Sequence, residues 1–208
     1  CVNGNQIFFS EKNYKSEFIT PFNDLFGNHY LTDEKIKDLK AGDSIKLSGY
    51  IYTARDSAHA RLFKLVEEGK ELPFDIKGAV IYYVGPSPTM PNQVIGSAGP
   101  TTSYRMDAYA PTLLDLGLKG MIGKGQRNKE VREAITRNKG IYFGATGGAA
   151  ALIAKAVKEN ELVAYEDLGP EAIRKLYVED FPLTVINDIY GNDLYDIGKE
   201  QYKIVEDK

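Results

Sequence analysis

The segment Arg55-Asp56-Ser57-Ala58-His59 brings an arginine and a histidine within one helical turn of each other. A guanidinium group can hold a carboxylate through two parallel hydrogen bonds, which an ammonium group cannot imitate. An imidazole four residues further along a helix lies on the same face and can exchange a proton near neutral pH. Arg55 and His59 therefore suggest a carboxylate site with a proton-transfer group. The competing interpretation is an Arg–Asp surface pair that caps a helix, and this segment taken by itself favours the surface pair.

A second segment, from Ser97 to Asp107, combines a Gly-Pro turn with hydroxyl groups and one arginine. Thr101 and Thr102 directly follow the turn, and Arg105 comes three residues later. Hydroxyls and backbone N–H groups at a helix start can bind an anion. The alternative is that the threonines only cap the helix. Two adjacent threonines plus an arginine exceed what a cap requires, so the sequence favours an anion site.

Two glycine-rich turns complete the candidate set. Lys124 lies between Gly123 and Gly125, where a bare backbone lets a lysine reach a bound anion, although a surface turn is equally compatible. The turn 144–148 precedes a predicted helix, and Glu166 follows at roughly the 20-residue spacing of a ribose-binding acid in dinucleotide sites. The glycines of the turn 144–148 are spaced G-x-x-G-G, whereas a dinucleotide site has G-x-G-x-x-G. Close packing of a helix on a strand explains these small residues equally well.

Predicted strands and helices alternate around these turns. The continuous apolar run from Ala79 to Val84 is typical of a strand buried on both faces. Other strands are expected at 44–53, 120–123, 140–143, 162–165 and 183–189, and helices at 56–69, 106–116, 128–138, 149–159 and from Gly169-Pro170 onward. This alternation predicts an α/β fold with a largely parallel central sheet, at whose strand ends ligands collect.

Composition excludes several classes of protein. The chain has 208 residues and a net charge of -3, so no basic surplus exists to neutralise nucleic-acid phosphates. No apolar stretch is long enough to span a membrane. One cysteine and two histidines cannot assemble the usual zinc site or hold an iron–sulfur cluster within this chain. The lone thiol and the lack of a signal-peptide pattern lead us to expect a cytoplasmic protein.

Six motifs occur in a fixed order along the chain. They are Arg55-Asp-Ser-Ala-His59, Ile81-Tyr-Tyr-Val-Gly-Pro86, Ser97-Ala-Gly-Pro-Thr-Thr102 with Arg105-Met-Asp107, Ile122-Gly-Lys-Gly125, Gly144-Ala-Thr-Gly-Gly148 and Val178-Glu-Asp-Phe-Pro182. As a set they resemble the β subunit, or C-terminal domain, of class I iron–sulfur fumarate hydratase and of the related L-tartrate dehydratase. The resemblance spans residues 31–198. We therefore expect a catalytic domain at 31–208, preceded by an N-terminal extension at 1–30 whose order the sequence does not define.

The resemblance implies a swivelling β/β/α domain and a hydro-lyase that interconverts (S)-malate and fumarate, a step of the tricarboxylic acid cycle. In this family three cysteines of an α subunit hold a [4Fe–4S] cluster, whose open iron acts as a Lewis acid on the substrate. The chain would then be incomplete without the α subunit. A hetero-oligomer is implied, with a homodimer of the isolated chain as the alternative.

The resemblance also implies roles for the polar residues. The two substrate carboxylates would be held by Arg55, Arg105 and Lys124, and the reacting carbons would be lined by Thr101 and Thr102. Thr101 is the candidate base for the C3 proton, and His59 is a second candidate. A threonine alkoxide is costly, so a catalytic Thr101 needs nearby positive charge from Arg105 and Lys124.

Three other functions stay open at this point. The first is L-tartrate dehydratase, whose substrate differs from malate by one hydroxyl. The second is a nucleotide-binding oxidoreductase built on the turn 144–148 and Glu166. The third is a non-catalytic module that binds a small dicarboxylate.

Overall fold

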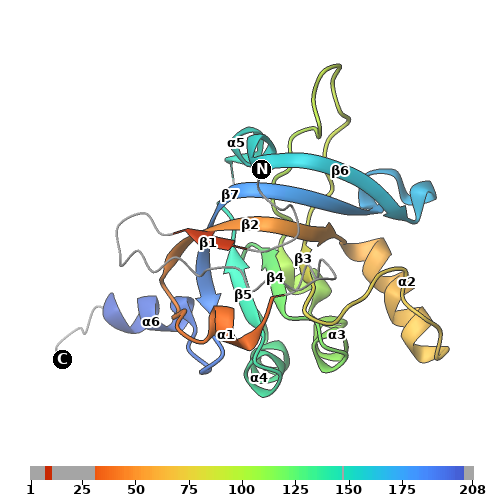
Figure 1. Ribbon diagram of the computed structural model, residues 1–208. Helices are drawn as coiled ribbons and strands as arrows, with labels where there is room; N and C mark the ends of the chain where they lie inside the picture. Colours follow the sequence, from red (N-terminus) through yellow and green to blue (C-terminus); the bar gives the residue numbers. More distant parts are fainter. Residues whose placement is uncertain (1–7, 11–30, 147, 204–208) are drawn as a thin grey trace.

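The computed structural model describes residues 31–146 and 148–203, together with a short strand, β1 (Phe8–Ser10). The predicted extension therefore lies outside the described residues except for β1, and so does Gly147 of the last glycine-rich turn. Within the described part, strands and helices alternate as expected, and the fold is mixed α/β (Figure 1).

A closed five-stranded barrel forms the centre of the fold. Four strands are parallel neighbours, namely β2 (Ser44–Thr53), β3 (Val80–Tyr82), β4 (Gly120–Gly123) and β5 (Ile141–Gly144). The long strand β7 (Ile173–Asn187) runs antiparallel to both β2 and β5 and so closes the barrel. The edge strands β1 and β6 (Val157–Ala164) are also antiparallel to their neighbours. A largely parallel sheet is thus confirmed for β2 to β5 but is wrong for the sheet as a whole.

Helices cover the outside of the parallel strands. In Figure 1, α2 (Asp56–Glu67), α3 (Ala110–Asp115) and α4 (Lys129–Arg137) lie along the lower side of the sheet. The remaining helices are α1 (Asp33–Ile36), α5 (Ala150–Ala156), α6 (Leu194–Gln201) and the 3-10 turns Ser103–Met106 and Glu166–Glu171. In the described part of the chain, every helix is too short or too polar to cross a bilayer.

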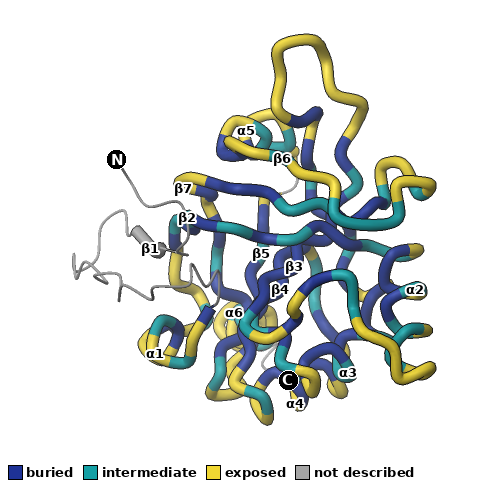
Figure 2. Tube along the Cα trace, turned by 45° about the vertical axis from the view of Figure 1, so that its right-hand side comes forward, coloured by how far each residue is buried: buried dark blue, intermediate teal, exposed yellow. Residues whose placement is uncertain are grey.

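The parallel strands are buried on both faces. Along β3, Val80 and Tyr82 point into the barrel core, whereas Ile81 and the following Tyr83 point into the layer beneath α2, α3 and α4. The same alternation puts Tyr142 of β5 in the helix layer. Since side chains alternate across a strand, the continuous apolar run at Ala79 to Val84 is explained by two cores, one on each face. Figure 2 shows these strands as the buried centre of the molecule.

In the last third of the chain, one helix prediction is confirmed only in part and another is wrong. The helix expected at 149–159 ends at Ala156, and the next residue, Val157, begins β6. The helix expected after Gly169-Pro170 is only the 3-10 turn, after which β7 begins. The reason is tertiary pairing, because β7 bonds to β2 on one edge and to β6 and then β5 on the other. The pairing with β2 has a bulge at residues 179–180, where Asp180 adopts φ 52°, and the strand continues through Pro182.

Candidate active site

The carboxyl ends of the four parallel strands meet at one edge of the barrel, and the predicted site segments leave from that edge. Backbone bonds continue the sheet beyond the strands: Tyr83 N–H donates to Ile122 O at 2.9 Å, and Ala145 N–H donates to Gly123 O at 2.8 Å. The threonine segment joins the same edge, because Thr101 N–H donates to Tyr83 O at 2.7 Å. In α/β proteins, ligands bind at the carboxyl ends of parallel strands, both in open sheets and in barrels.

Arg55 and Arg105 come together around a single carboxylate oxygen. Arg55 Nε lies 2.9 Å from Asp56 Oδ2, and Arg105 Nη2 lies 3.0 Å from the same atom. The two arginine side chains are 24% and 39% exposed, so solvent and small solutes can reach this cluster. The Arg–Asp surface pair of the alternative interpretation does exist. It is shared, however, with an arginine from a different loop, so the geometry is that of two cations facing one carboxylate.

Glu171 supports Arg55 from the 3-10 turn before β7. Its Oε1 lies 3.3 Å from Arg55 Nη2, and its Oε2 accepts a 2.8 Å hydrogen bond from Ser57 N–H in the first turn of α2. A carboxylate is stabilised at a helix N-terminus by the unpaired backbone N–H groups there. Gly85 leaves room for the guanidinium, because a Cβ at that position would lie 2.9 Å from Arg55 Nη1. Glu171 lies outside the motifs, and nothing in the sequence around it predicts this role.

The two threonines do not cap a helix. Thr102 precedes the 3-10 turn Ser103–Met106 but makes no side-chain capping bond, so the capping alternative loses its basis. Thr102 instead pairs with Lys124 as an isolated parallel bridge, and the preceding Thr101 is buried, with only 7% of its surface exposed. The threonine segment and the lysine turn are therefore adjacent backbone strands at the same edge.

Lys124 occupies a turn fixed by its neighbours. Its side chain is exposed and makes no ion pair with any residue that the structure describes. Its backbone carbonyl accepts from Ser103 N–H at 2.9 Å, and Gly125 after it adopts φ +88°. Since that φ favours glycine, the sequence Gly123-Lys124-Gly125 reflects a specific backbone path. The turn is therefore at the surface, as in the alternative interpretation, but hydrogen bonds hold its backbone in place.

His59 is separated from the other candidates by burial. Its side chain is fully buried between the rings of Tyr83 and Tyr109, with centroids 5.3 and 6.0 Å away. Nδ1 lies 3.3 Å from the carbonyl oxygen of Arg55, so Nδ1 carries the hydrogen and Nε2 does not. Burial, opposed by that hydrogen bond, lowers the pKa of His59 to about 4. The two residues were expected on one helix face, but Arg55 is the extended N-cap residue that precedes α2 and only His59 lies within the helix, so they do not share an accessible face.

A buried polar cluster beneath the site was not predicted. Arg127 Nε donates to Asp107 Oδ1 at 2.7 Å, and its guanidinium lies over the rings of Tyr83 and Tyr142 at 5.3 and 5.1 Å. Asp107 also accepts from Asn128 N–H at 2.8 Å, at the start of α4. In the sequence, Arg127 stands in a polar segment before a helix and carries no signal of burial. Only the fold reveals that both tyrosines and the arginine meet in the layer under the strand ends.

The chain matches a known protein family over most of its length. A model of the family described as Fumarase C-terminus matches residues 12–198. The chain belongs to this family. The match confirms the resemblance drawn from the six motifs, and it begins ahead of Leu31. Where the domain boundary lies stays a prediction.

The relatives of this fumarase C-terminal chain are of two lengths. It is 45% identical over 153 residues to "Fumarate hydratase class I, anaerobic" of Escherichia coli, covering 73% of this chain and 28% of that protein. "Fumarate hydratase 2" of Leishmania major is 38% identical over 164 residues, covering 78% and 29%. A Methanocaldococcus jannaschii protein provisionally named L(+)-tartrate dehydratase subunit beta is 38% identical over 180 residues, covering 83% and 92%. The chain thus spans under a third of the fumarate hydratases but nearly all of the β subunit.

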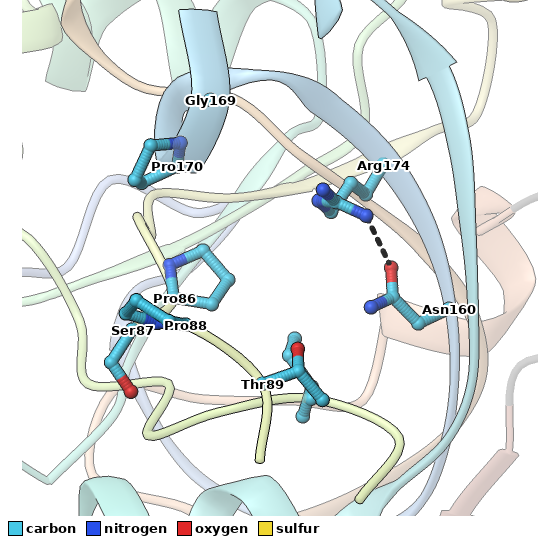
Figure 3. Close-up of a pocket in the computed structure, with 9 residues that line it drawn as sticks. Pro86, Ser87, Pro88, Thr89, Asn160, Gly169, Pro170 and Arg174 are labelled. Atoms are coloured by element: carbon cyan, nitrogen blue, oxygen red, sulfur yellow. Dashed lines mark hydrogen bonds between the residues drawn. The ribbon is translucent and has the colours of Figure 1, made fainter. Parts of the chain in front are cut away.

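The fumarase C-terminal chain also has a cleft beside the site, of about 240 Å³, in which none of the predicted residues lies. Figure 3 shows Pro86, Pro88 and Pro170 on one side and Arg174 on the other, hydrogen-bonded to Asn160 at 3.4 Å. The cleft offers one cation and no second charged group, so it does not compete with the strand ends as a dicarboxylate site.

The dinucleotide interpretation lacks its fold element. A dinucleotide site requires a parallel βαβ unit whose glycine turn opens the helix. In this chain α5 is followed by β6, which pairs antiparallel with β7 and not with β5. Glu166 is exposed in the 3-10 turn rather than at the end of a parallel strand.

The described residues also offer few ligands for a metal ion. Among the described residues, no group of three or more histidine, cysteine or acidic side chains could hold a metal ion. The sequence contains a single cysteine, Cys1, which lies outside the described part. The residues of this chain therefore do not fit an iron–sulfur cluster, which needs several thiolates.

Proposed function

We propose that this chain is the β portion of a class I fumarate hydratase, a hydro-lyase that interconverts (S)-malate and fumarate. The observation that carries the proposal is the pair of arginines from two loops around one carboxylate oxygen, next to a threonine segment and a lysine turn. A dicarboxylate needs two cationic sites with the reacting carbons between them, and this edge of the barrel offers that combination.

In the proposed complex, the chain's own residues bind and orient the substrate. Arg55 and Arg105 hold one carboxylate in the place where Asp56 now lies between them, and Lys124 holds the other. Guanidinium forks fix the plane of a carboxylate, whereas the lysine supplies a point charge on a flexible stem. The threonines then face the bond between C2 and C3 from the floor of the site.

For the C3 proton we propose Thr101 as the base. Its hydroxyl makes no hydrogen bond with any described residue, and its backbone is fixed at the end of β3. The cationic groups of Arg105 and Lys124 favour the charged form of a nearby hydroxyl. His59 is less suitable, because its ring is enclosed by tyrosines and, among the described residues, the ring hydrogen-bonds only to the backbone carbonyl of Arg55. It remains the second candidate.

The cluster and the rest of the site belong, in this proposal, to an α subunit. A [4Fe–4S] cluster would have to come from that partner, since this chain has one cysteine. The fumarate hydratases that it resembles are more than three times longer than the matched region. This supports the proposal that the enzyme has a further portion besides the matched region. We further propose a swivelling β/β/α domain that moves against this partner, in a cytoplasmic hetero-oligomer. A homodimer is the alternative for the chain by itself.

L-tartrate dehydratase is the second candidate function. It is favoured by one observation, namely that the match to the protein provisionally named as its β subunit covers 92% of that protein. The same cationic residues would hold the two carboxylates of tartrate.

The test is solvent deuterium exchange at C3 of malate, in the enzyme assembled anaerobically with an α subunit. In Thr101→Val we expect turnover to fall by about 100-fold, the usual scale for losing a positioned base. Exchange should be lost while malate binding survives. His59→Asn should keep exchange, and Thr136→Val, which removes an exposed hydroxyl on α4, is the matched control.

The outcomes separate the candidates. Exchange lost in His59→Asn but retained in Thr101→Val would assign the base to His59. Faster turnover of L-tartrate than of malate would assign the second function. If the isolated chain binds malate but gains no activity with any α subunit, the non-catalytic module is correct. If the isolated chain dehydrates malate, the two-subunit proposal is wrong.

A further inference from the structure

Two hydroxyl groups lie directly under the turn that carries Lys124. Ser103 Oγ accepts a hydrogen bond from Lys124 N–H at 3.1 Å and lies 2.8 Å from the hydroxyl of Tyr142. The Tyr142 hydroxyl in turn donates to the carbonyl oxygen of Gly125 at 2.8 Å. These contacts begin and end on the same turn.

The direction of every bond in this series is fixed by chemistry. A backbone N–H can only donate and a carbonyl can only accept, while each hydroxyl has one hydrogen to give. Tyr142 uses its hydrogen on Gly125, so the bond between the hydroxyls must be donated by Ser103 and accepted by Tyr142. The series therefore runs from Lys124 N–H through Ser103 and Tyr142 to Gly125 O. Removing either hydroxyl breaks it.

The surroundings hold both hydroxyls in place. Ser103 is fully buried, and a Cβ at Gly123 would lie 2.0 Å from its Oγ, so only glycine at 123 lets this serine approach. The ring of Tyr142 lies under the Arg127 guanidinium. Burial raises the pKa of Tyr142 well above its usual range, so the hydroxyl keeps the hydrogen that it donates.

We propose that Ser103 and Tyr142 are positioning residues that hold the Lys124 turn beside the threonine segment, so that the lysine meets a substrate carboxylate. Ser103 is suited to this because it follows Thr102 directly and also bonds the Lys124 carbonyl through its own N–H at 2.9 Å. One serine thus fixes the distance between the two backbone segments of the site. The importance of this for activity rests on the proposed function.

The first experiment measures backbone hydrogen exchange at the Lys124 turn in the full chain. We expect Ser103→Ala to speed exchange of the Lys124 amide by about tenfold or more, since its acceptor is gone. Tyr142→Phe should speed it less. The control is Tyr190→Phe, which removes a hydroxyl that donates to the Lys37 carbonyl at 2.6 Å, away from this turn. Unchanged exchange at Lys124 in both site variants would overturn the proposal.

The second experiment uses the assembled enzyme with malate. Tyr142→Phe should raise KM by about tenfold and leave kcat within about threefold, because binding of a non-reacting carboxylate is what weakens. In a Lys124→Ala background the same substitution should change KM by less than about twofold, since it acts only through the lysine. An equal effect in both backgrounds, or an effect on kcat alone, would contradict positioning of Lys124.

The two experiments distinguish failure of the proposed function from failure of the positioning proposal. If the wild-type assembly converts neither malate nor tartrate, the hydro-lyase proposal is wrong. The exchange measurement on the full chain then still decides whether the two hydroxyls hold the turn.

Discussion

The chain contains two arginine–aspartate clusters that are close in the fold but differ in their access to solvent. At the strand ends, Arg55 and Arg105 share Asp56 at 2.9 and 3.0 Å, and all three side chains are partly exposed. One layer deeper, Arg127 binds Asp107 at 2.7 Å, with 0% and 7% of the two side chains exposed. The distances are similar, so the two clusters differ mainly in how far water reaches them.

Solvent access decides whether an arginine can change its partner. An exposed pair contributes little to stability, because water replaces most of what the pair supplies. Asp56 can therefore yield its place to a substrate carboxylate at small cost. A buried pair cannot be opened without leaving an uncompensated charge in the interior. The exposed cluster of Arg55, Arg105 and Asp56 is thus suited to binding a substrate. The buried pair of Arg127 and Asp107 is suited to stabilising the fold beneath it.

The strongest test of this comparison is Arg127→Met. The substitution keeps an apolar stem but leaves Asp107 buried without its cation, which costs about 3–5 kcal/mol of unfolding free energy. Urea denaturation measures the loss, and Arg137→Met, at an exposed pair with Asp115, is the control. A loss below that of the control would mean that burial does not distinguish the clusters.

The burial of His59 leads us to expect that stability depends on pH. Its ring contacts Tyr83, which in turn lies under the Arg127 guanidinium of the buried pair. Its pKa is about 4 in the folded chain because burial disfavours the charged ring, whereas an unfolded histidine titrates near 6.5. Between these values the unfolded state binds more protons, so stability falls as the pH drops from about 6.5 to 4 and then levels off. The shift corresponds to a loss on the order of 3 kcal/mol.

The measurement compares unfolding free energies at pH 7 and pH 4.5 for the wild type and His59→Phe. Carboxylates contribute equally to both proteins, so the difference between them reports His59. Equal slopes in the two proteins would show that the ring is charged or solvated in the folded chain.

Arg105→Lys should affect the proposed reaction more than folding. The lysine keeps the charge but loses the planar fork, so we expect a loss of about 2–3 kcal/mol in kcat/KM of the assembled enzyme. Unfolding free energy should change by less than about 1 kcal/mol, because the pair with Asp56 is partly exposed and water screens it. Wild-type kinetics would remove Arg105 from the site.

The smallest effect is expected for Asp56→Asn. Since both of its arginine partners are reached by water, unfolding free energy should change by no more than about 1 kcal/mol. Differential scanning calorimetry against the wild type is sufficient. A loss as large as that in Arg127→Met would place the two clusters in one class and break the comparison.

Local patterns predicted the parallel half of the barrel well. The strand at 44–53 alternates buried and half-buried residues along its length, and glycines mark both ends of the strand at 120–123. The helix at 129–137 begins at Asn128, whose side chain accepts from Val131 N–H at 2.9 Å. Each of these elements is specified by neighbours in the sequence.

The antiparallel half was predicted only in part, since the strands expected at 162–165 and 183–189 overlap just the last residues of β6 and β7. The segment that becomes β7 contains Pro182 and the charged pair Glu179-Asp180, which locally disfavour a strand, and its partners are distant in sequence. The residues of the site also fall into a predicted and an unpredicted group. Its exposed cations came from motifs, whereas Glu171 and Arg127 gain their roles only from packing. Which groups support a site is decided by the fold, since burial and partner choice are properties of the whole chain.

The closing strand β7 also has a consequence for how the protein folds. Thr53, at the end of β2, receives a backbone hydrogen bond from Arg174, 121 positions later, and gives its own hydroxyl hydrogen to Ala172, 119 positions later. Contacts between such distant residues must be made after a long loop has been closed, which slows folding. During synthesis, the strand ends that carry the arginines and threonines therefore cannot adopt their final arrangement until β7 has left the ribosome. We expect refolding of the barrel on the millisecond-to-second scale of chains dominated by long-range strand pairing.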